Sequence, residues 1–91
     1  MIRLRGTVEY DGGRVEEFRA GSAVFVAWEA YARRQGFPAY DESNANTMAH
    51  YCAYVALGIR EGFDVWLRSV VDVDAEEAEA ADPIPEEALA E

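Results

Sequence analysis

Residues 2–20 read IRLRGTVEYDGGRVEEFRA, and this stretch decides the class of fold. Up to Tyr10 apolar and polar side chains alternate, a period of two that is typical of a strand with one buried face. Asp11-Gly12-Gly13 is a strong signal for a tight turn, because glycine accepts the positive φ that hairpin turns require. On the return strand, Val15 and Phe18 are out of phase by one residue, which predicts a bulge or an early end of that strand. We therefore predict an N-terminal β-hairpin.

An isolated hairpin is barely stable in water, so its apolar face needs a partner, and the residues that follow have helical spacing. Ser22 is suited to cap a first helix, which Gly36 and Pro38 end. Its apolar stripe is formed by Val24, Phe25, Trp28, Tyr31 and Ala32, continued by Gln35.

A second helix is predicted from Ser43 or Asn44 to Glu61, with Gly62 ending it. Two apolar stripes run along it, which predicts a central helix with neighbours on two sides. The first stripe comprises Met48, Tyr51, Cys52, Val55 and Ile59, and the second comprises His50, Tyr54 and Leu57.

A third helix is predicted after Asp64, which can cap it, with Trp66, Leu67, Val70 and Val71 on one side. The predicted fold class is therefore α+β, with the N-terminal β-hairpin packed on a small bundle of two to three α-helices.

The charge is concentrated at one end of the chain. The 91 residues include 18 acidic and 8 basic side chains, a formal net charge of -10. From residue 63 onward there is a single basic residue, Arg68, and from residue 75 the chain consists largely of glutamate, alanine and aspartate without aromatic residues. Such a segment buries too little apolar surface to offset its ordering entropy. We predict one domain over residues 1–74 and a disordered acidic C-terminal tail over residues 75–91.

Composition excludes several classes of function. A strongly acidic chain lacks the basic surface that nucleic acid or an anionic membrane requires. The start of the chain has no apolar core typical of a signal peptide, and no window approaches the about 18 apolar residues of a membrane span. The single cysteine, Cys52, forms no intramolecular disulfide, which favours a reducing compartment. We expect a cytoplasmic protein without nucleic-acid or membrane partners.

The residues that most often carry chemistry point to no enzyme. His50 and Cys52 lie about 200° apart around a helix axis and cannot form a nucleophile–base pair. Both are predicted to be packing residues. Asp72-Val73-Asp74 resembles the start of a calcium loop, but Glu77 stands where such a loop needs glycine. No phosphate-binding or nucleophile motif is present. We predict no catalytic activity and no bound metal or cofactor.

The aromatic residues are the best lead to function. Eleven occur in the chain, more than three short helices clearly need for their core, and aromatic anchors dominate the energetics of protein interfaces. The alternative is that they fill the core of an alanine-rich protein. We predict a partner-binding surface on the helical side, formed by Trp28, Tyr31, Tyr54, Phe63 and Trp66.

The order of these segments resembles the tail assembly chaperones of long-tailed, siphovirus-type bacteriophages over residues 4–74. The matching text is VEYDG (residues 8–12), AWE (27–29), YVAL (54–57) and above all GFDVWL (62–67) followed by VVDVD (70–74). The loop over residues 37–43 departs from the family pattern because it lacks basic residues.

The resemblance implies a small protein in the host cell cytoplasm that is absent from the finished virion. It implies binding to the tape measure protein, recruitment of tail tube subunits during assembly and, as a family trait, a longer product made by ribosomal frameshifting. The predicted aromatic surface suits self-association as well, so a homo-oligomer is an open alternative. Two other functions remain open: a structural head–tail joining protein of the virion, and an acidic DNA mimic that inhibits a nucleic-acid-binding protein.

Overall fold

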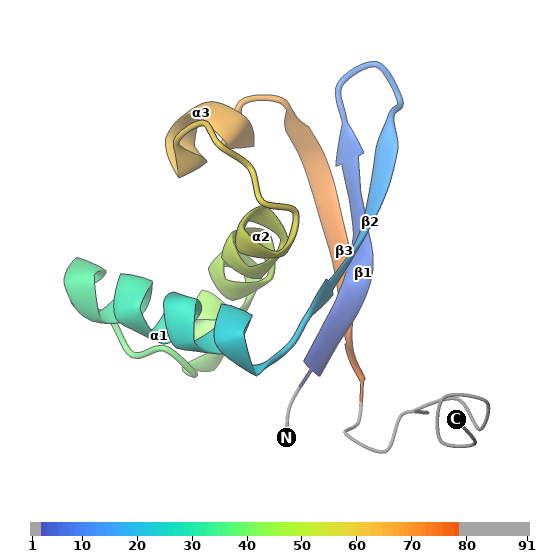
Figure 1. The fold of residues 1–91 in the computed structure, drawn as a ribbon. Coiled ribbons are helices and arrows are strands. Elements are labelled where there is room, and N and C mark those ends of the chain that lie inside the picture. Colours follow the sequence, from blue (N-terminus) through green and yellow to red (C-terminus); the bar gives the residue numbers. More distant parts are fainter. Residues whose placement is uncertain (1–2, 79–91) are drawn as a thin grey trace, which may run out of the picture.

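The computed structural model describes residues 3–78, which form one three-stranded sheet with helices on one of its faces (Figure 1). The sheet has the order β2-β1-β3, and both neighbouring pairs are antiparallel. The predicted α+β class is confirmed. In chain order the elements are β1 (Arg3–Tyr10), β2 (Val15–Ala20), α1 (Ser22–Gln35), the 3-10 helix η1 (Glu42–Asn44), α2 (Ala45–Ala56), α3 (Phe63–Leu67) and β3 (Val70–Ala78).

The predicted hairpin is present, but the predicted bulge in it is wrong. β1 and β2 pair without interruption from Leu4 with Ala20 to Glu9 with Val15. The side chain of Phe18 is buried on the face of β2 that packs on the helices, whereas Val15 lies on the opposite face and is 57% exposed. The irregularity lies instead between β1 and β3, at Glu9 and Tyr10.

The largest correction concerns the end of the domain. Val70 and Val71 belong to strand β3 and not to the third helix, and β3 continues to Ala78, so the predicted boundary at residue 74 is wrong. β3 pairs with β1, at least 60 residues earlier in the chain, from Arg3 with Ala78 to Tyr10 with Val70. The predicted disorder of the tail beyond residue 78 lies outside the described residues.

The helices have somewhat different ends from those predicted. Gly21 and Gly62 stand at the N-caps of α1 and α3, in place of Ser22 and Asp64. α2 ends at Ala56 rather than at Glu61, because the chain turns at Gly58 with a φ of 67°. The predicted end of α1 at Gly36 is confirmed, with the left-handed conformation that glycine adopts most readily.

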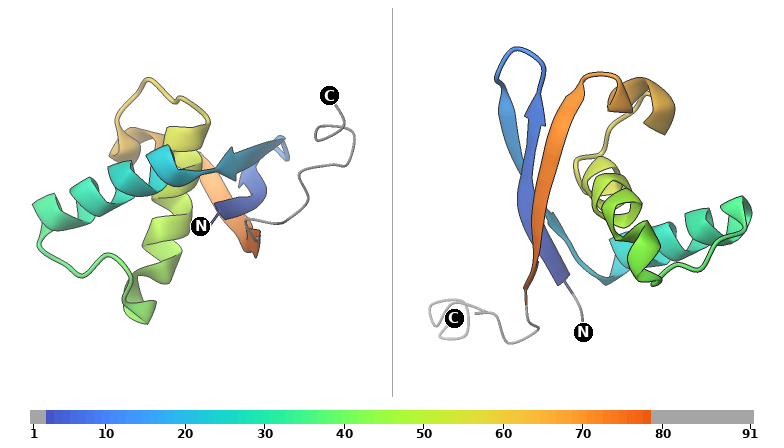
Figure 2. Two further views of the ribbon diagram at one scale, coloured as in Figure 1. Left: turned by 60° about the horizontal axis from the view of Figure 1, so that its bottom comes forward. Right: turned by 180° about the vertical axis from the view of Figure 1, so that it is seen from behind.

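The core lies on both sides of α2, which is the central helix as predicted. Cys52 packs in a cluster with Trp28 of α1, whereas Ala53 packs in a second cluster with Trp66 of α3 and the sheet. Figure 2 shows that all the helices stay on one side of the sheet and that α1 runs away from it toward its C-terminal end. Among residues 3–78, no helix lies on the other face of the sheet, called the outer face below.

Candidate partner-binding surface

Four half-buried rings from three helices meet in what we call the aromatic layer: Tyr31 of α1, Tyr51 and Tyr54 of α2, and Phe63 of α3. Tyr31 and Tyr51 are stacked, with ring centroids 4.3 Å apart. The ring of Phe63 stands edge-on to all three tyrosines, at centroid distances of 5.8, 5.1 and 5.2 Å. Stacked and edge-on pairs at such distances are favourable, so each ring helps to fix the others.

Local sequence explains how the layer forms. Tyr51 and Tyr54 lie three residues apart on α2 and therefore share a face of that helix. Tyr31 follows Trp28 at the same spacing on α1. Phe63 is the first residue of α3, directly after its N-cap Gly62. Since α1 and α3 both pack on α2, their rings converge over its Tyr51–Tyr54 face.

Both tryptophans lie beneath this layer, and the prediction that they are exposed anchors is wrong. Trp28 is 0% and Trp66 1% exposed. The indole N–H of Trp28 donates a hydrogen bond to the carbonyl of Ala39 at 2.9 Å, and that of Trp66 donates to the hydroxyl of Tyr10 at 3.1 Å. Because each indole finds its polar partner inside the fold, both rings act as core, as the alternative interpretation of the aromatic residues held.

The five predicted partner-binding residues do belong to one network of ring contacts. Trp28 lies 6.0 Å from Tyr31, and Trp66 lies 6.1 Å from Phe63, between ring centroids. Within this network Tyr31, Tyr54 and Phe63 are partly accessible. The sequence interpretation missed Tyr51 as a site residue, although its spacing from Tyr54 was a signal that it shares the surface.

Polar and charged groups lie around the aromatic layer. The hydroxyl of Tyr54 donates to the carbonyl of Glu61 at 2.7 Å. Burial, and next the nearby carboxylate of Asp64, raise the pKa of Tyr31. The guanidinium of Arg34 lies 5.8 Å from the Tyr31 ring centroid, a cation–π distance. Tyr31 is therefore neutral at physiological pH, with Asp64 and Arg34 beside it.

The packing roles predicted for His50 and Cys52 fit their surroundings. The Nδ1 atom of His50 is 2.8 Å from the carbonyl oxygen of Asn46, one helical turn earlier. Cys52 is 0% exposed, and burial raises the pKa of its thiol to about 12. A thiol that stays protonated at neutral pH is a poor nucleophile.

Asp72 and Asp74 lie on the regular strand β3 and not in a loop. Within residues 3–78, no group of three or more histidine, cysteine, aspartate or glutamate side chains is arranged to hold a metal ion. The helices in the same range are too short or too polar to cross a membrane.

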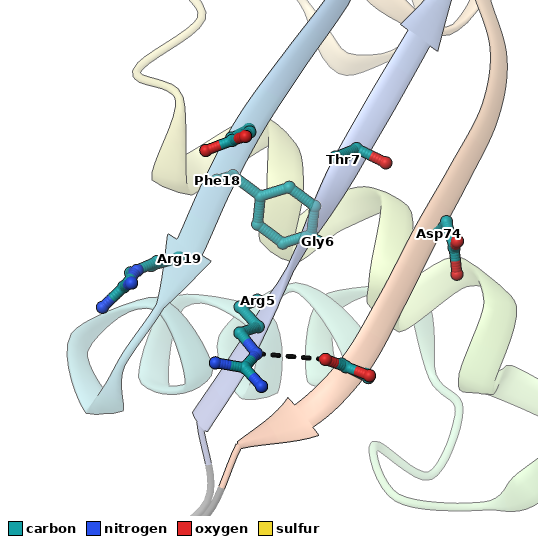
Figure 3. A pocket seen from close by; sticks show the side chains of 8 residues that line it. Arg5, Gly6, Thr7, Phe18, Arg19 and Asp74 are labelled. Atoms are coloured by element: carbon teal, nitrogen blue, oxygen red, sulfur yellow. Dashed lines mark hydrogen bonds and ion pairs between the residues drawn. The ribbon is translucent and has the colours of Figure 1, made fainter. Parts of the chain in front are cut away.

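A shallow hollow of about 590 Å³ lies on the outer face of the sheet, away from the aromatic layer (Figure 3). Gly6 of β1 is one of the residues that line it, together with charged side chains of both signs. Arg5 donates from Nε to Glu76 at 3.1 Å. Arg19 and Asp74 lie on the two flanking strands. The hollow is thus polar and open, unlike the aromatic layer.

No protein-family model matches this chain, and neither does a curated protein or a solved structure.

Proposed function

We propose that this protein is a tail assembly chaperone of a long-tailed bacteriophage that binds the tape measure protein and helps to recruit tail tube subunits. The observation that carries the proposal is the aromatic layer, in which half-buried rings from α1, α2 and α3 form one surface. The resemblance of residues 4–74 to that chaperone family supports the identity of the partner.

The layer has the properties of a protein-binding surface. Its rings hold one another through five ring contacts with centroid distances between 4.3 and 5.8 Å, so little side-chain freedom remains to be lost on binding. Tyrosine presents a large apolar area with a polar tip, which suits a surface that must face water before the partner arrives. A client helix with an apolar stripe would cover the rings and place its polar face outward.

The acidic character of the chain supports the same function. A protein that covers an apolar client must keep the complex soluble, and the net charge of -10 opposes aggregation of such complexes.

The test is binding to the client. We propose a pull-down with a fragment of the long helical protein encoded downstream of this gene, with a tail tube gene upstream as the expected context. Phe63→Ala and Tyr54→Ala should each weaken binding by tenfold or more, as hot-spot rings do. Tyr40→Ala is the matched control, since Tyr40 is 56% exposed and lies outside the layer.

If Phe63→Ala and Tyr54→Ala bind the client as tightly as the control Tyr40→Ala, the aromatic layer is not the client-binding surface. No binding by the wild-type chain, or a neighbourhood without tail genes, would contradict the chaperone function itself. If Phe63→Ala instead dissolves a homo-oligomer and leaves client binding intact, the layer is a self-association surface.

One observation favours the DNA-mimic alternative. Asp72, Asp74 and Glu76 occupy alternate positions of strand β3, with side chains about 7 Å apart. A rigid row of carboxylates is what such an inhibitor needs. Competition with DNA for a basic DNA-binding protein would support it, and detection of the chain in purified virions would support the head–tail joining role.

A further inference from the structure

Strand β3 ends the sheet with a free main-chain edge. Within residues 3–78 it pairs with β1 alone. In the central strand β1, the N–H of Tyr10 donates a hydrogen bond to the carbonyl of Arg14, on the β2 side. Main-chain groups of successive residues point to opposite sides of a strand, so the N–H and C=O of Thr7, three residues before Tyr10, point to β3. Thr7 pairs with Asp74. The N–H and C=O groups of Val73, Ala75 and Glu77 consequently point to the free edge.

The side chains of β3 differ between its two faces. Asp72, Asp74 and Glu76 lie on the outer face and are exposed. Glu76 pairs with Arg5, whereas Asp72 and Asp74 have no ion-pair partner in the described part of the chain. On the helix side, Val73 is 8% exposed and packs in the cluster of Trp66. The edge is therefore acidic on the outer face, and on the helix side it is apolar at Val73 and Ala75 and acidic only at Glu77, near its end.

We propose that the free edge of β3 binds an extended, basic segment of a partner protein, which adds to the sheet as a fourth strand. Its main chain would pair with the free groups of Val73, Ala75 and Glu77. Because side chains alternate along a strand, the segment would carry arginine or lysine beside Asp72, Asp74 and Glu76. Small apolar residues at the positions between them would extend the face of Val73 and Ala75.

Charge favours a basic segment of another protein over a second copy of this chain at the β3 edge. A second copy would bring together two chains with a net charge of -10 each, which opposes association. The other edge strand, β2, is shorter and carries Arg19 and Glu17 together, so it offers no uniform charge to a partner. This surface is separate from the aromatic layer, and the inference does not depend on the proposed function.

A test uses the full chain and a nine-residue peptide of alternating arginine and valine. We expect binding at 150 mM salt with new hydrogen-exchange protection at the amides of Val73, Ala75 and Glu77. The same peptide with N-methyl groups on one edge should lose that protection and bind at least tenfold more weakly, because it cannot complete the ladder. A peptide of equal composition without alternation is the second control.

Two variants locate the site. Asp72→Asn with Asp74→Asn should weaken binding of the alternating peptide about tenfold, a few-fold for each exposed carboxylate. Ala75→Pro should abolish binding while keeping the β1 ladder, because the lost N–H is one that faces the free edge. Its thermal unfolding temperature reports whether the fold survives.

Equal binding of the N-methylated peptide would overturn the proposal, because attraction by charge alone would then suffice. No binding of the alternating peptide would overturn it as well, and the carboxylates would then serve only to protect the edge from pairing.

Discussion

At the scale of single residues, Gly6 is the position where a side chain is least tolerated. An ideal Cβ atom there would lie 2.1 Å from the carbonyl oxygen of Asp74 and 2.8 Å from the Cα of Ala75. Both atoms are main chain of β3, so relief requires a shift of the whole strand. Gly6→Ala should therefore lower the free energy of unfolding by about 3 kcal/mol, as overpacking of a tight site does.

Urea unfolding measures this cost, and Gly21→Ala is the matched control. A Cβ at Gly21 meets nothing within 4 Å, so the control should cost less than about 1 kcal/mol. Equal stability of both variants would show that β3 does not pass this close to Gly6.

Cys52 makes a prediction about alkaline pH. Its thiol has a pKa of about 12 in the fold, raised from 9.0 by burial, so the folded state favours the protonated thiol. The stability that this contributes is complete below pH 9 and is lost as the pH rises from 9 toward 12. Tyr10, Tyr31 and Tyr40 also have raised pKa values, so the wild-type chain should lose stability steeply in this range.

Cys52→Ala should show a shallower loss between pH 8 and pH 11 in urea unfolding, because only the tyrosine contribution remains. The same slope in both proteins would contradict the burial of the thiol.

At the scale of elements, α3 is held to the sheet by a short chain of polar contacts under its aromatic rings. The indole of Trp66 donates to the hydroxyl of Tyr10, which in turn donates to Glu16 at 2.6 Å. Tyr10→Phe removes both bonds and leaves a buried indole N–H without an acceptor. We expect a loss of about 2 kcal/mol in the free energy of unfolding.

Tyr40→Phe is the control for this prediction, because the hydroxyl of Tyr40 bonds to Glu29 in an exposed position. It should cost less than about 1 kcal/mol. An equally small loss in Tyr10→Phe would mean that α3 does not depend on this contact.

The elements also show what sequence can predict. The hairpin and α2 follow from short-range signals, a glycine turn and helical spacing, and both are present. Strand β3 was missed because Val70 and Val71 also fit a helical stripe, and because the glutamate- and alanine-rich composition from residue 75 onward suggested a disordered tail. What makes these residues a strand is pairing with β1, a non-local contact that local patterns do not encode.

For the site, the kind of residue was predictable and its exposure was not. Aromatic abundance pointed to Tyr31, Tyr54 and Phe63, which are partly accessible. Trp28 and Trp66 have the same sequence signal, yet they are buried, because helix packing decides which rings of a cluster lie beneath the others.

At the scale of the whole molecule, the two proposed surfaces are separate. The helices cover one face of the sheet and carry the aromatic layer, while β3 ends the sheet at one edge (Figures 1 and 2). The two surfaces share no residue, and Val73 and Ala75 of β3 lie in the same hydrophobic cluster as Tyr54 and Phe63 of the layer.

The central claim, that the aromatic layer binds the client, is tested most directly by fluorine NMR of the chain labelled with 3-fluorotyrosine. The five tyrosines give five signals, which single Tyr→Phe substitutions assign. Adding the tape measure fragment should shift the signals of Tyr31, Tyr51 and Tyr54 and leave those of Tyr10 and Tyr40 in place. Shifts at Tyr10 or Tyr40 with the other three unchanged would contradict the claim.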